Sequence, residues 1–135
     1  MNWTLELVVV PVSDIDRAKS FYAEKAGFEL NVDHRSGEDF RVVQLTPTGS
    51  GCSIALMKTE MQPGSLKGLQ LCVADIDAAR AELVERGVEV SEVFHFGEAG
   101  QTPGRDPNGA DYNSFISFSD PDGNAWVVQE VKARG

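Results

Sequence analysis

The sequence predicts an α+β protein built from two βαβββ repeats. The stretch at residues 8–27, VVVPVSDIDRAKSFYAEKAG, returns in shortened form at residues 71–87, LCVADIDAARAELVERG. Each copy runs from an apolar segment through an Asp-Ile-Asp step into a segment of helical spacing that ends at a glycine. Because two sheets with apolar faces and open edges must bury those faces, we expect one curved, mostly antiparallel eight-stranded sheet with the helices outside.

The first repeat is expected over about residues 5–58. Leu5–Val12 is apolar and β-branched, which predicts a strand, and Asp14 can accept hydrogen bonds from the free N–H groups of a helix start. Apolar residues then recur at helical spacing up to Gly27, where glycine ends a helix without steric cost. The polar segment Asp33–Asp39 predicts a turn. The other expected strands are Phe28–Val32, Phe40–Leu45 and Cys52–Met57.

A linker and a second repeat complete what we expect to be a single domain over residues 1–135. Residues 59–68, TEMQPGSLKG, have linker composition, and the second repeat covers about residues 69–131. Its helix is expected at Asp75–Arg86. The long polar loop Gly97–Asp111 is expected to be either a lid over the sheet or disordered. In the segment DPDGN, Asp120 and Asp122 are expected to serve a tight turn. The expected strands are Leu69–Val73, Val88–Phe96, Tyr112–Ser119 and Ala125–Val131.

Composition excludes several classes of partner. The formal charge of −9 disfavours nucleic acid and anionic membranes, which both require a basic surface. No apolar run approaches the roughly 20 residues that a membrane span needs, and the N-terminus lacks the pattern of a secretory signal. Cys52 and Cys72 lie in separate apolar runs, which is typical of buried thiols in a reducing compartment. We therefore expect a cytoplasmic protein.

Three segments together resemble one protein superfamily. They are VVVPVSDIDRAKSFYAEKAGFEL at the start, LCVADIDAARAELVERGVEV in the middle and FSDPDGNAWVVQEV at the end, in that order along nearly the whole chain. They resemble the vicinal oxygen chelate superfamily, which includes the glyoxalase I, bleomycin-resistance and extradiol dioxygenase families. The resemblance implies a glyoxalase-like fold whose curved sheet forms a trough, with a ligand or substrate bound in the trough. It also implies, for the enzymes, a divalent metal held by His and Glu side chains from both halves.

This chain departs from that pattern at every metal-binding position. The positions that the resemblance assigns to ligands carry Leu7, Gly68, Val127 and the apolar run Ile54-Ala55-Leu56. None of these side chains can coordinate a cation that prefers imidazole or carboxylate, so we predict no metal cofactor. An alternative is a displaced site, in which the two histidines meet and an acidic residue completes the coordination. Its candidate ligands are His34, His95, Glu98 and Asp111.

Strand alternation supplies candidates for the ligand-binding surface. If Val127 points into the trough, Gln129 does so too, whereas Trp126 and Val128 pack against the helices. Flanked by Phe94 and Phe96, His95 is the candidate catalytic residue, because a histidine can donate or accept a proton near neutral pH. The predicted ligand-binding residues are Leu7, Gln70, His95, Ser117, Val127 and Gln129.

We therefore expect a metal-free protein, similar to the bleomycin-resistance branch, that binds a small organic molecule in the trough and forms a homodimer. The alternative is an enzyme resembling glyoxalase I or a related lyase, isomerase or dioxygenase, which would use a displaced metal or metal-free acid–base chemistry at His95. A third possibility is an accessory protein whose trough has lost its function. The sequence does not identify the ligand.

Overall fold

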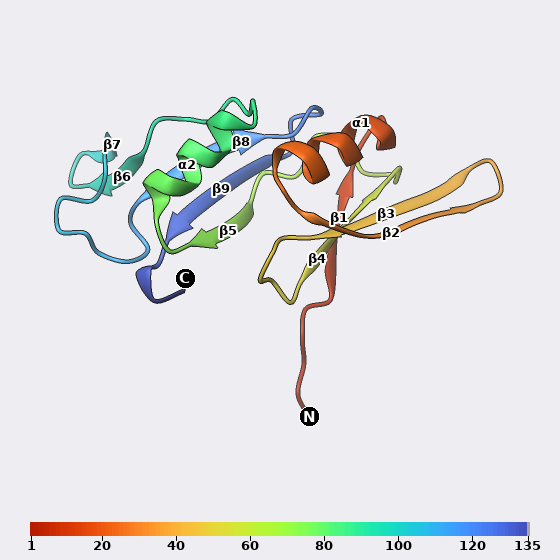
Figure 1. Ribbon diagram of the computed structural model, residues 1–135, viewed down its shortest axis with the longest axis horizontal. Helices are drawn as coiled ribbons and strands as arrows, with labels where there is room; N and C mark the ends of the chain where they lie inside the picture. The colour runs from red at the N-terminus through yellow and green to blue at the C-terminus, as the bar shows by residue number, and fades with distance from the viewer. Residues whose placement is uncertain (135) are drawn as a thin grey trace. The chain divides into compact units, whose positions relative to one another are not determined.

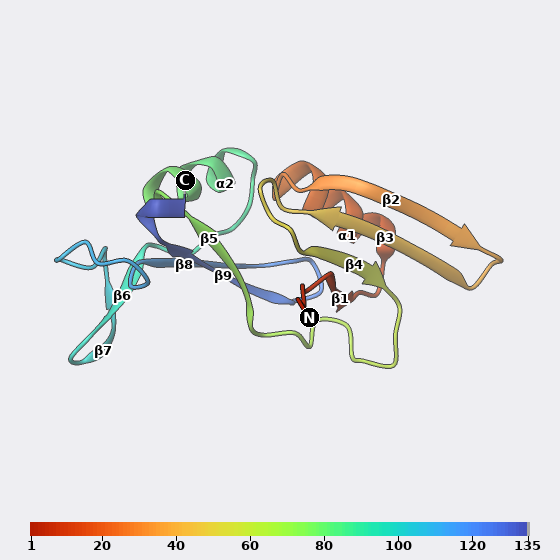
Figure 2. The same cartoon turned by 90° about the horizontal axis from the view of Figure 1, so that it is seen from below.

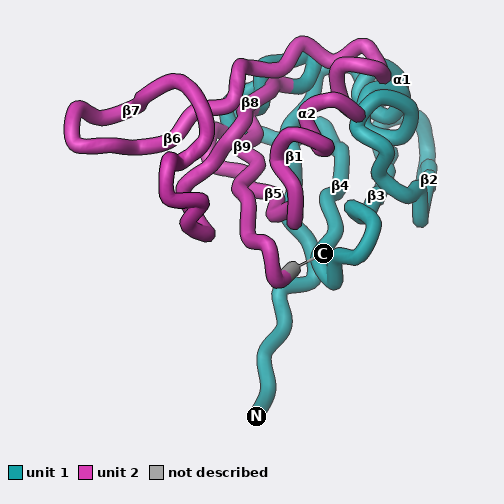
Figure 3. Tube along the Cα trace, turned by 60° about the vertical axis from the view of Figure 1, so that its left-hand side comes forward, with its two compact units in different colours: residues 1–66, 120–124 teal, residues 67–119, 125–135 magenta. Residues whose placement is uncertain are grey.

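The computed structural model describes residues 1–134. The chain forms two compact units, residues 1–66 with 120–124 and residues 67–119 with 125–135 (Figure 3). Each unit contains a sheet with a helix packed beside it, as Figure 1 shows. Across residues 1–134, no helix has both the length and the apolar character needed to cross a membrane. The predicted α+β class and its two repeats are confirmed.

The first unit follows the predicted order of a strand, a helix and three further strands. Its sheet has the order β1-β4-β3-β2, with β1 parallel to β4 and the other neighbours antiparallel. Figure 2 shows that β2 and β3 form a long hairpin reaching past α1. The elements are β1 (Leu7–Pro11), α1 (Ile15–Ser20), the π-helical segment η1 (Phe21–Lys25), β2 (Glu29–Ser36), β3 (Phe40–Thr46) and β4 (Ser53–Met57).

The start of α1 is the one predicted, but its second half is wider than an α-helix. The Asp14 side chain accepts a hydrogen bond from the Arg17 backbone N–H at 3.0 Å, which caps the first turn. Further on, the Ala26 N–H donates to the Phe21 carbonyl oxygen, five residues back, at 2.9 Å. This π-helical turn keeps both Phe21 and Tyr22 buried.

The DPDGN segment forms the predicted turn and also holds the first unit together. Asp120 Oδ1 accepts hydrogen bonds from the backbone N–H groups of Asp122 and Asn124, and Gly123 takes a φ of +98°. The other Asp120 oxygen, Oδ2, accepts a hydrogen bond of 2.7 Å from the hydroxyl of Tyr22, which is fully buried. The turn therefore satisfies its own backbone and supplies a buried acceptor to η1.

The second unit repeats this order with one additional strand. Its sheet has the order β5-β9-β8-β6-β7, with β5 parallel to β9, and α2 packs against β8 and β9. A short 3₁₀ turn, η2 (Lys132–Arg134), follows the last strand. The elements are β5 (Leu69–Val73), α2 (Ile76–Glu85), β6 (Phe94–Gly97), β7 (Gly100–Pro103), β8 (Phe115–Ser119) and β9 (Ala125–Glu130).

A buried carboxylate organises the start of α2. Glu130 is 1% exposed, and its Oε2 accepts a hydrogen bond of 2.9 Å from the Ile76 backbone N–H. Its Oε1 lies 2.6 Å from the Arg105 guanidinium, which also bonds to Asp77 of α2 at 2.9 Å. The hydrogen bond from Arg105 to Asp77 is the main reason that the pKa of Arg105 is raised. Arg105 thereby ties the loop before β8 to α2.

Several predicted boundaries are wrong; β8, for example, begins at Phe115 and not at Tyr112. β2 continues through Asp33–Ser36, where a turn was predicted, because Asp33 is held by Lys19 at 2.8 Å and by Arg41 at 2.9 Å. β6 begins only at Phe94, because upstream the Ser91 hydroxyl accepts the Ser117 N–H and the segment pairs with β8 only through an isolated bridge between Val90 and Phe118. The segment predicted as a lid or a disordered loop contains β7, which pairs with β6.

The strand count also differs from the prediction. The ladders in residues 1–134 form one sheet of four strands and one of five, rather than a single sheet of eight. The additional strand is β7, which extends the hairpin that begins with β6.

Candidate functional site

One face of the second sheet is turned away from α2. The Glu130 side chain reaches the first turn of α2. Trp126 and Val128, which are four and two residues before it in β9, point to the same face, so they also face the helix and are buried. Val127 and Gln129 therefore lie on the opposite face and are only partly buried. We call this surface the α2-free face. The predicted split between Trp126 and Val128 on the helix side and Val127 and Gln129 on the other agrees with this register.

Strand register assembles two rows of side chains on the α2-free face. In the first row, Val127 of β9 pairs with Gln70 of β5 on one side and Ser117 of β8 on the other. Residues directly paired across neighbouring strands point to the same face, so these three predicted binding residues are neighbours. The second row lies two residues further along each strand and consists of Cys72, Gln129, Phe115 and Phe94.

Three phenylalanines make the end of the second row aromatic. The rings of Phe94 and Phe115 stack with centroids 5.5 Å apart and an interplanar angle of 26°. Phe96 meets both rings edge to face, at 6.0 Å from Phe94 and 5.5 Å from Phe115, and remains 53% exposed. Exposed aromatic rings next to uncharged polar side chains are typical of binding sites for organic molecules.

An asparagine side chain holds the backbone of Phe96 in place. Asn113 Oδ1 accepts a hydrogen bond from the Phe96 N–H at 3.0 Å, and its Nδ2 donates to the Phe96 carbonyl oxygen at 3.1 Å. Asn113 thus takes the place of a neighbouring strand beyond the single β6–β8 pair at Phe94 and Phe115. The preceding residue, Tyr112, is 56% exposed and has a φ of +68°, which non-glycine residues rarely adopt.

His95 lies on the other face of the same sheet. It sits between Phe94 and Phe96 in β6, so its side chain points away from theirs, and it is 7% exposed. Its Nδ1 lies 2.7 Å from the Gly104 carbonyl oxygen, a geometry in which the ring nitrogen donates. His95 therefore does not share a face with Gln70, Ser117 and the other residues of the two rows, and its catalytic or ligand-binding role stays a prediction.

Asp106, two residues after Gly104, fixes the same loop. It accepts hydrogen bonds from the backbone N–H groups of Asn108 at 3.3 Å and Ala110 at 3.0 Å, and its own N–H donates to the Ser114 hydroxyl. These bonds, first that from Asn108, lower the pKa of the Asp106 carboxyl. The charge stabilises the loop on which the His95 acceptor lies.

Leu7 belongs to the first unit. It pairs with Ser53 and lies on the face of the first sheet that is turned away from α1. In the run Ile54-Ala55-Leu56, only Ala55 has the same orientation, since it pairs with Val9 of β1 and Gln44 of β3. Gly68 lies directly before β5, with open space where a side chain would project.

The positions that the resemblance assigned to metal ligands offer no donor atoms. Leu7, Ala55 and Val127 have hydrocarbon side chains and Gly68 has none, so they do not fit a divalent cation. Within residues 1–134, no three side chains of His, Cys, Asp or Glu gather closely enough to hold a metal ion. Of the histidines considered for a displaced site, His34 lies on β2 of the first unit and His95 on β6 of the second.

The aromatic part of this surface was not among the predicted site residues, although the sequence contains a signal for it. Phe94 and Phe96 alternate around His95, and Phe115 alternates with Ser117, so each pair shares one strand face. Joining these faces requires the β6–β8 register, which no local pattern encodes. The bracing by Asn113 has no comparable sequence signal.

Comparisons with known proteins agree with this fold and place it in a family. Residues 4–128 match the family model described as the Glyoxalase/Bleomycin resistance protein/Dioxygenase superfamily. The protein YetH of Bacillus subtilis (strain 168) is 28% identical over 127 residues, covering 91% of this chain and 94% of YetH.

Solved structures give the same picture. TnmS3, an antibiotic binding protein from Streptomyces sp. CB03234, is 37% identical, with a TM-score of 0.76 and 96% of each chain covered. A member of the same superfamily from Sphaerobacter thermophilus DSM 20745 is 30% identical, with a TM-score of 0.74, covering 96% of this chain and 98% of its own. The family match spans most of the chain, and the relatives are similar over nearly their full length. The chain therefore belongs to the Glyoxalase/Bleomycin resistance protein/Dioxygenase superfamily.

Proposed function

We propose that the protein binds a small, flat organic molecule on the α2-free face and uses no metal ion to do so. The observation that carries the proposal is the pair of rows in which Gln70, Ser117 and Gln129 lie beside the phenylalanine cluster. Stacked and edge-on rings favour a planar aromatic ligand, to which the amide and hydroxyl groups can form hydrogen bonds.

The charge of the surface narrows the class of ligand. The side chains of the two rows are Gln, Val and Ser, then Cys, Gln, Phe and Phe, none of them a carboxylate, ammonium or guanidinium. A ligand group that carries a full charge would lose its hydration here without gaining an ionic partner. We therefore propose that the part of the ligand that contacts this face is uncharged.

The relatives support binding rather than a named reaction. TnmS3, with 37% identity, is an antibiotic binding protein, and a similar role here is part of our proposal. The homodimer expected from the resemblance belongs to the same proposal, and sedimentation equilibrium of the purified chain tests it.

Titration with planar aromatic antibiotics, followed by calorimetry, tests the binding proposal. Ser117→Ala is expected to weaken the binding of whichever compound saturates the wild-type protein by about fivefold, because it removes one hydrogen bond. Gln44→Ala is the matched control, since Gln44 holds in the first repeat the place that Ser117 holds in the second, and affinity is expected to be unchanged. If a broad panel contains no compound that binds saturably, or if the two variants lose affinity equally, the proposal is wrong.

Metal removal tests the second part of the proposal. Protein dialysed against EDTA is expected to bind the same compound with the same affinity. Loss of binding on chelation, with recovery on adding one equivalent of a divalent ion, would contradict the metal-free proposal.

A further inference from the structure

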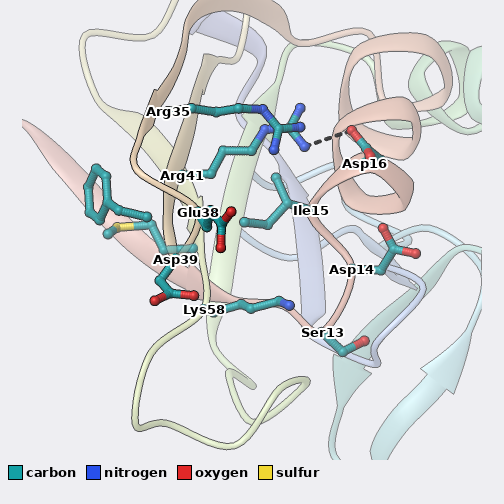
Figure 4. A pocket seen from close by; sticks show the side chains of 11 residues that line it. Ser13, Asp14, Ile15, Asp16, Arg35, Glu38, Asp39, Arg41 and Lys58 are labelled. Atoms are coloured by element: carbon teal, nitrogen blue, oxygen red, sulfur yellow. Dashed lines mark hydrogen bonds and ion pairs between the residues drawn. The ribbon is translucent and has the colours of Figure 1, made fainter.

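A hollow lies entirely within the first unit and shares no residue with the α2-free face. It has a volume of about 390 Å³ and opens between the β2–β3 hairpin and the segment Ser13–Asp16, where β1 leads into α1 (Figure 4). The end of β4, at Met57 and Lys58, completes its wall. This volume is within the range of small-molecule sites.

One wall of the hollow is a fixed ion-pair network. Arg41 binds Asp33 through two hydrogen bonds, of 3.0 Å from Nε and 2.9 Å from Nη2, and binds Asp16 of α1 at 2.7 Å from Nη1. Its hydrogen bonds hold the pKa values of both carboxyls below their usual range, and the hydrogen bond to Asp33 is the largest cause of the raised pKa of Arg41. The Arg41 guanidinium is therefore already paired with two carboxylates of the protein.

Four further charged side chains of the hollow form no such ion pairs with any described residue, whereas Asp14 caps α1. Arg35 is the cross-strand neighbour of Arg41, and Figure 4 shows Arg35, Glu38 and Lys58 directed into the same space. Within residues 1–134, no ion pair or side-chain hydrogen bond involves these three residues or Asp39, which also lines the hollow. The hydrogen bond from Arg41 is the largest cause of the lowered pKa of Asp16, to which Arg35 contributes only through space. Charges of both signs thus face one cavity without forming ion pairs with each other, and a ligand carrying both signs would pair with them.

The equivalent position in the second repeat holds a carboxylate. Lys58 follows β4 opposite Val12, just as Glu130 ends β9 opposite Val73, so the two positions are equivalent. In the second unit, the Glu130 carboxylate is buried beside α2 and neutralised by Arg105. In the first unit a lysine replaces that glutamate, and the carboxylate is missing from the space.

The apolar part of the hollow fits an aromatic body. The ring of Phe40 is 44% exposed, and Met57 and Ile15 also line the cavity. A thioether beside an aromatic ring packs well against another ring.

We propose that this hollow binds a small zwitterion, an amino acid or short peptide with an aromatic side chain. The ligand carboxylate takes the place of the missing glutamate and pairs with Lys58 and Arg35. The ligand ammonium pairs with Glu38, and its ring rests on Phe40. This site is independent of the α2-free face.

Calorimetry of the full chain with L-phenylalanine and glycyl-L-phenylalanine tests the proposal. The zwitterions are expected to bind with dissociation constants below about 1 mM, and at least about tenfold more tightly than 3-phenylpropanoate or 2-phenylethylamine, which each lack one charge. Lys58→Gln is expected to weaken L-phenylalanine binding about tenfold without affecting 2-phenylethylamine. Glu38→Gln is expected to weaken L-phenylalanine similarly without affecting 3-phenylpropanoate.

Matched controls separate this site from the rest of the protein. Lys25→Gln and Glu24→Gln, on exposed residues of η1, are expected to leave binding unchanged. All these positions are partly or fully exposed in the fold, and circular dichroism verifies that each variant is folded. No saturable binding of either zwitterion up to about 10 mM, equal affinity for singly charged analogues, or equal losses in test and control variants would each overturn the proposal.

Discussion

The two units share a backbone plan but differ in what their strands carry on the face away from the helix. Both helices begin with an aspartate cap. The side chain of Asp14 or Asp75 accepts a hydrogen bond from the backbone N–H three residues later, at 3.0 Å and 3.1 Å respectively. Both sheets place the first strand parallel to the last and antiparallel strands beyond it. The common plan therefore comes from caps and register, which the repeated sequence encodes.

The difference lies in the rows across the sheets. Where the second unit has Gln70, Val127 and Ser117, the first has Val9, Ala55 and Gln44. In the next row, the first unit has Pro11, Met57 and Val42, and the second unit has Cys72, Gln129 and Phe115 at the corresponding positions. On the face away from its helix, the second unit therefore carries aromatic rings and hydrogen-bonding groups at positions where the first unit has mainly aliphatic side chains.

The linker between the repeats gives the largest expected effect on stability. Gly64 has a φ of +80°, and an added Cβ would overlap the carbonyl group of Asp122, whereas Gly68 has open space around it. Gly64→Ala is expected to lower the free energy of unfolding by about 3–5 kcal/mol, and Gly68→Ala by less than about 0.5 kcal/mol. Urea denaturation of both variants measures the difference. Equal effects would show that the contact with the DPDGN turn is not important for the first unit.

Substitution of the buried Glu130 tests the difference between the two units at the start of the helix. Glu130→Ala leaves the Ile76 N–H and the Arg105 guanidinium without their shared acceptor, and is expected to cost about 2–3 kcal/mol. Lys58→Ala, at the equivalent place in the first unit, is expected to cost less than about 0.5 kcal/mol because Lys58 has no ion pair to lose. The urea midpoints of the two variants check this. A Lys58→Ala loss as large as that of Glu130→Ala would contradict the account.

The Tyr22 hydroxyl gives the first helical segment a side-chain hydrogen bond that has no equivalent in the second repeat. Its hydrogen bond to Asp120 is buried, whereas the equivalent residue in the second repeat is the apolar Leu83. Tyr22→Phe is expected to lower the free energy of unfolding by about 1–2 kcal/mol, since the Asp120 carboxylate loses a buried donor. Thermal melting of Tyr22→Phe, with Leu83→Met as a volume-conserving control, measures the effect. An unchanged melting temperature for Tyr22→Phe would contradict a structural role for the hydroxyl.

The smallest expected effect is on the pH dependence of protein stability, through Asp33 of the first unit. The hydrogen bond from Arg41, followed by that from Lys19, lowers the pKa of Asp33 in the folded state. A carboxyl with a lowered folded-state pKa stabilises the protein above its unfolded pKa of about 3.9, and this contribution is lost as the pH falls below that value. Asp33→Asn is expected to cost less than about 1 kcal/mol at neutral pH and to flatten the decline of stability below about pH 4. Urea unfolding across that pH range is the measurement, and an identical decline in the variant would contradict the role given to Asp33.

Local chemistry predicted the repeated features, and tertiary contacts decided the others. The caps at Asp14 and Asp75 and the DPDGN turn depend on neighbours in sequence, so they were predictable. The start of β6 depends on the Ser91 hydroxyl meeting Ser117, 26 residues away, which no periodicity reveals. β7 is composed of Gly, Gln, Thr and Pro and has no apolar alternation, so it carried no strand signal.

The candidate site follows the same division. Alternation alone predicted that Val127 and Gln129 face one way and Trp126 and Val128 the other. Grouping Gln70 and Ser117 with them relied on the resemblance and on the shared register of three strands. His95 was placed with them although alternation separates it from its phenylalanine neighbours, and its opposite orientation follows from that alternation.

Exchange of one pair of equivalent residues tests most directly whether binding belongs to the second unit's face. Gln129 and Met57 occupy matching positions in the rows of the two repeats. Gln129→Met is expected to weaken the binding of a planar aromatic ligand about tenfold by removing its hydrogen bond, and Met57→Gln is expected to leave its affinity unchanged. Calorimetric titration of both variants gives the answer. Loss of affinity in Met57→Gln with none in Gln129→Met would contradict the assignment of the binding surface.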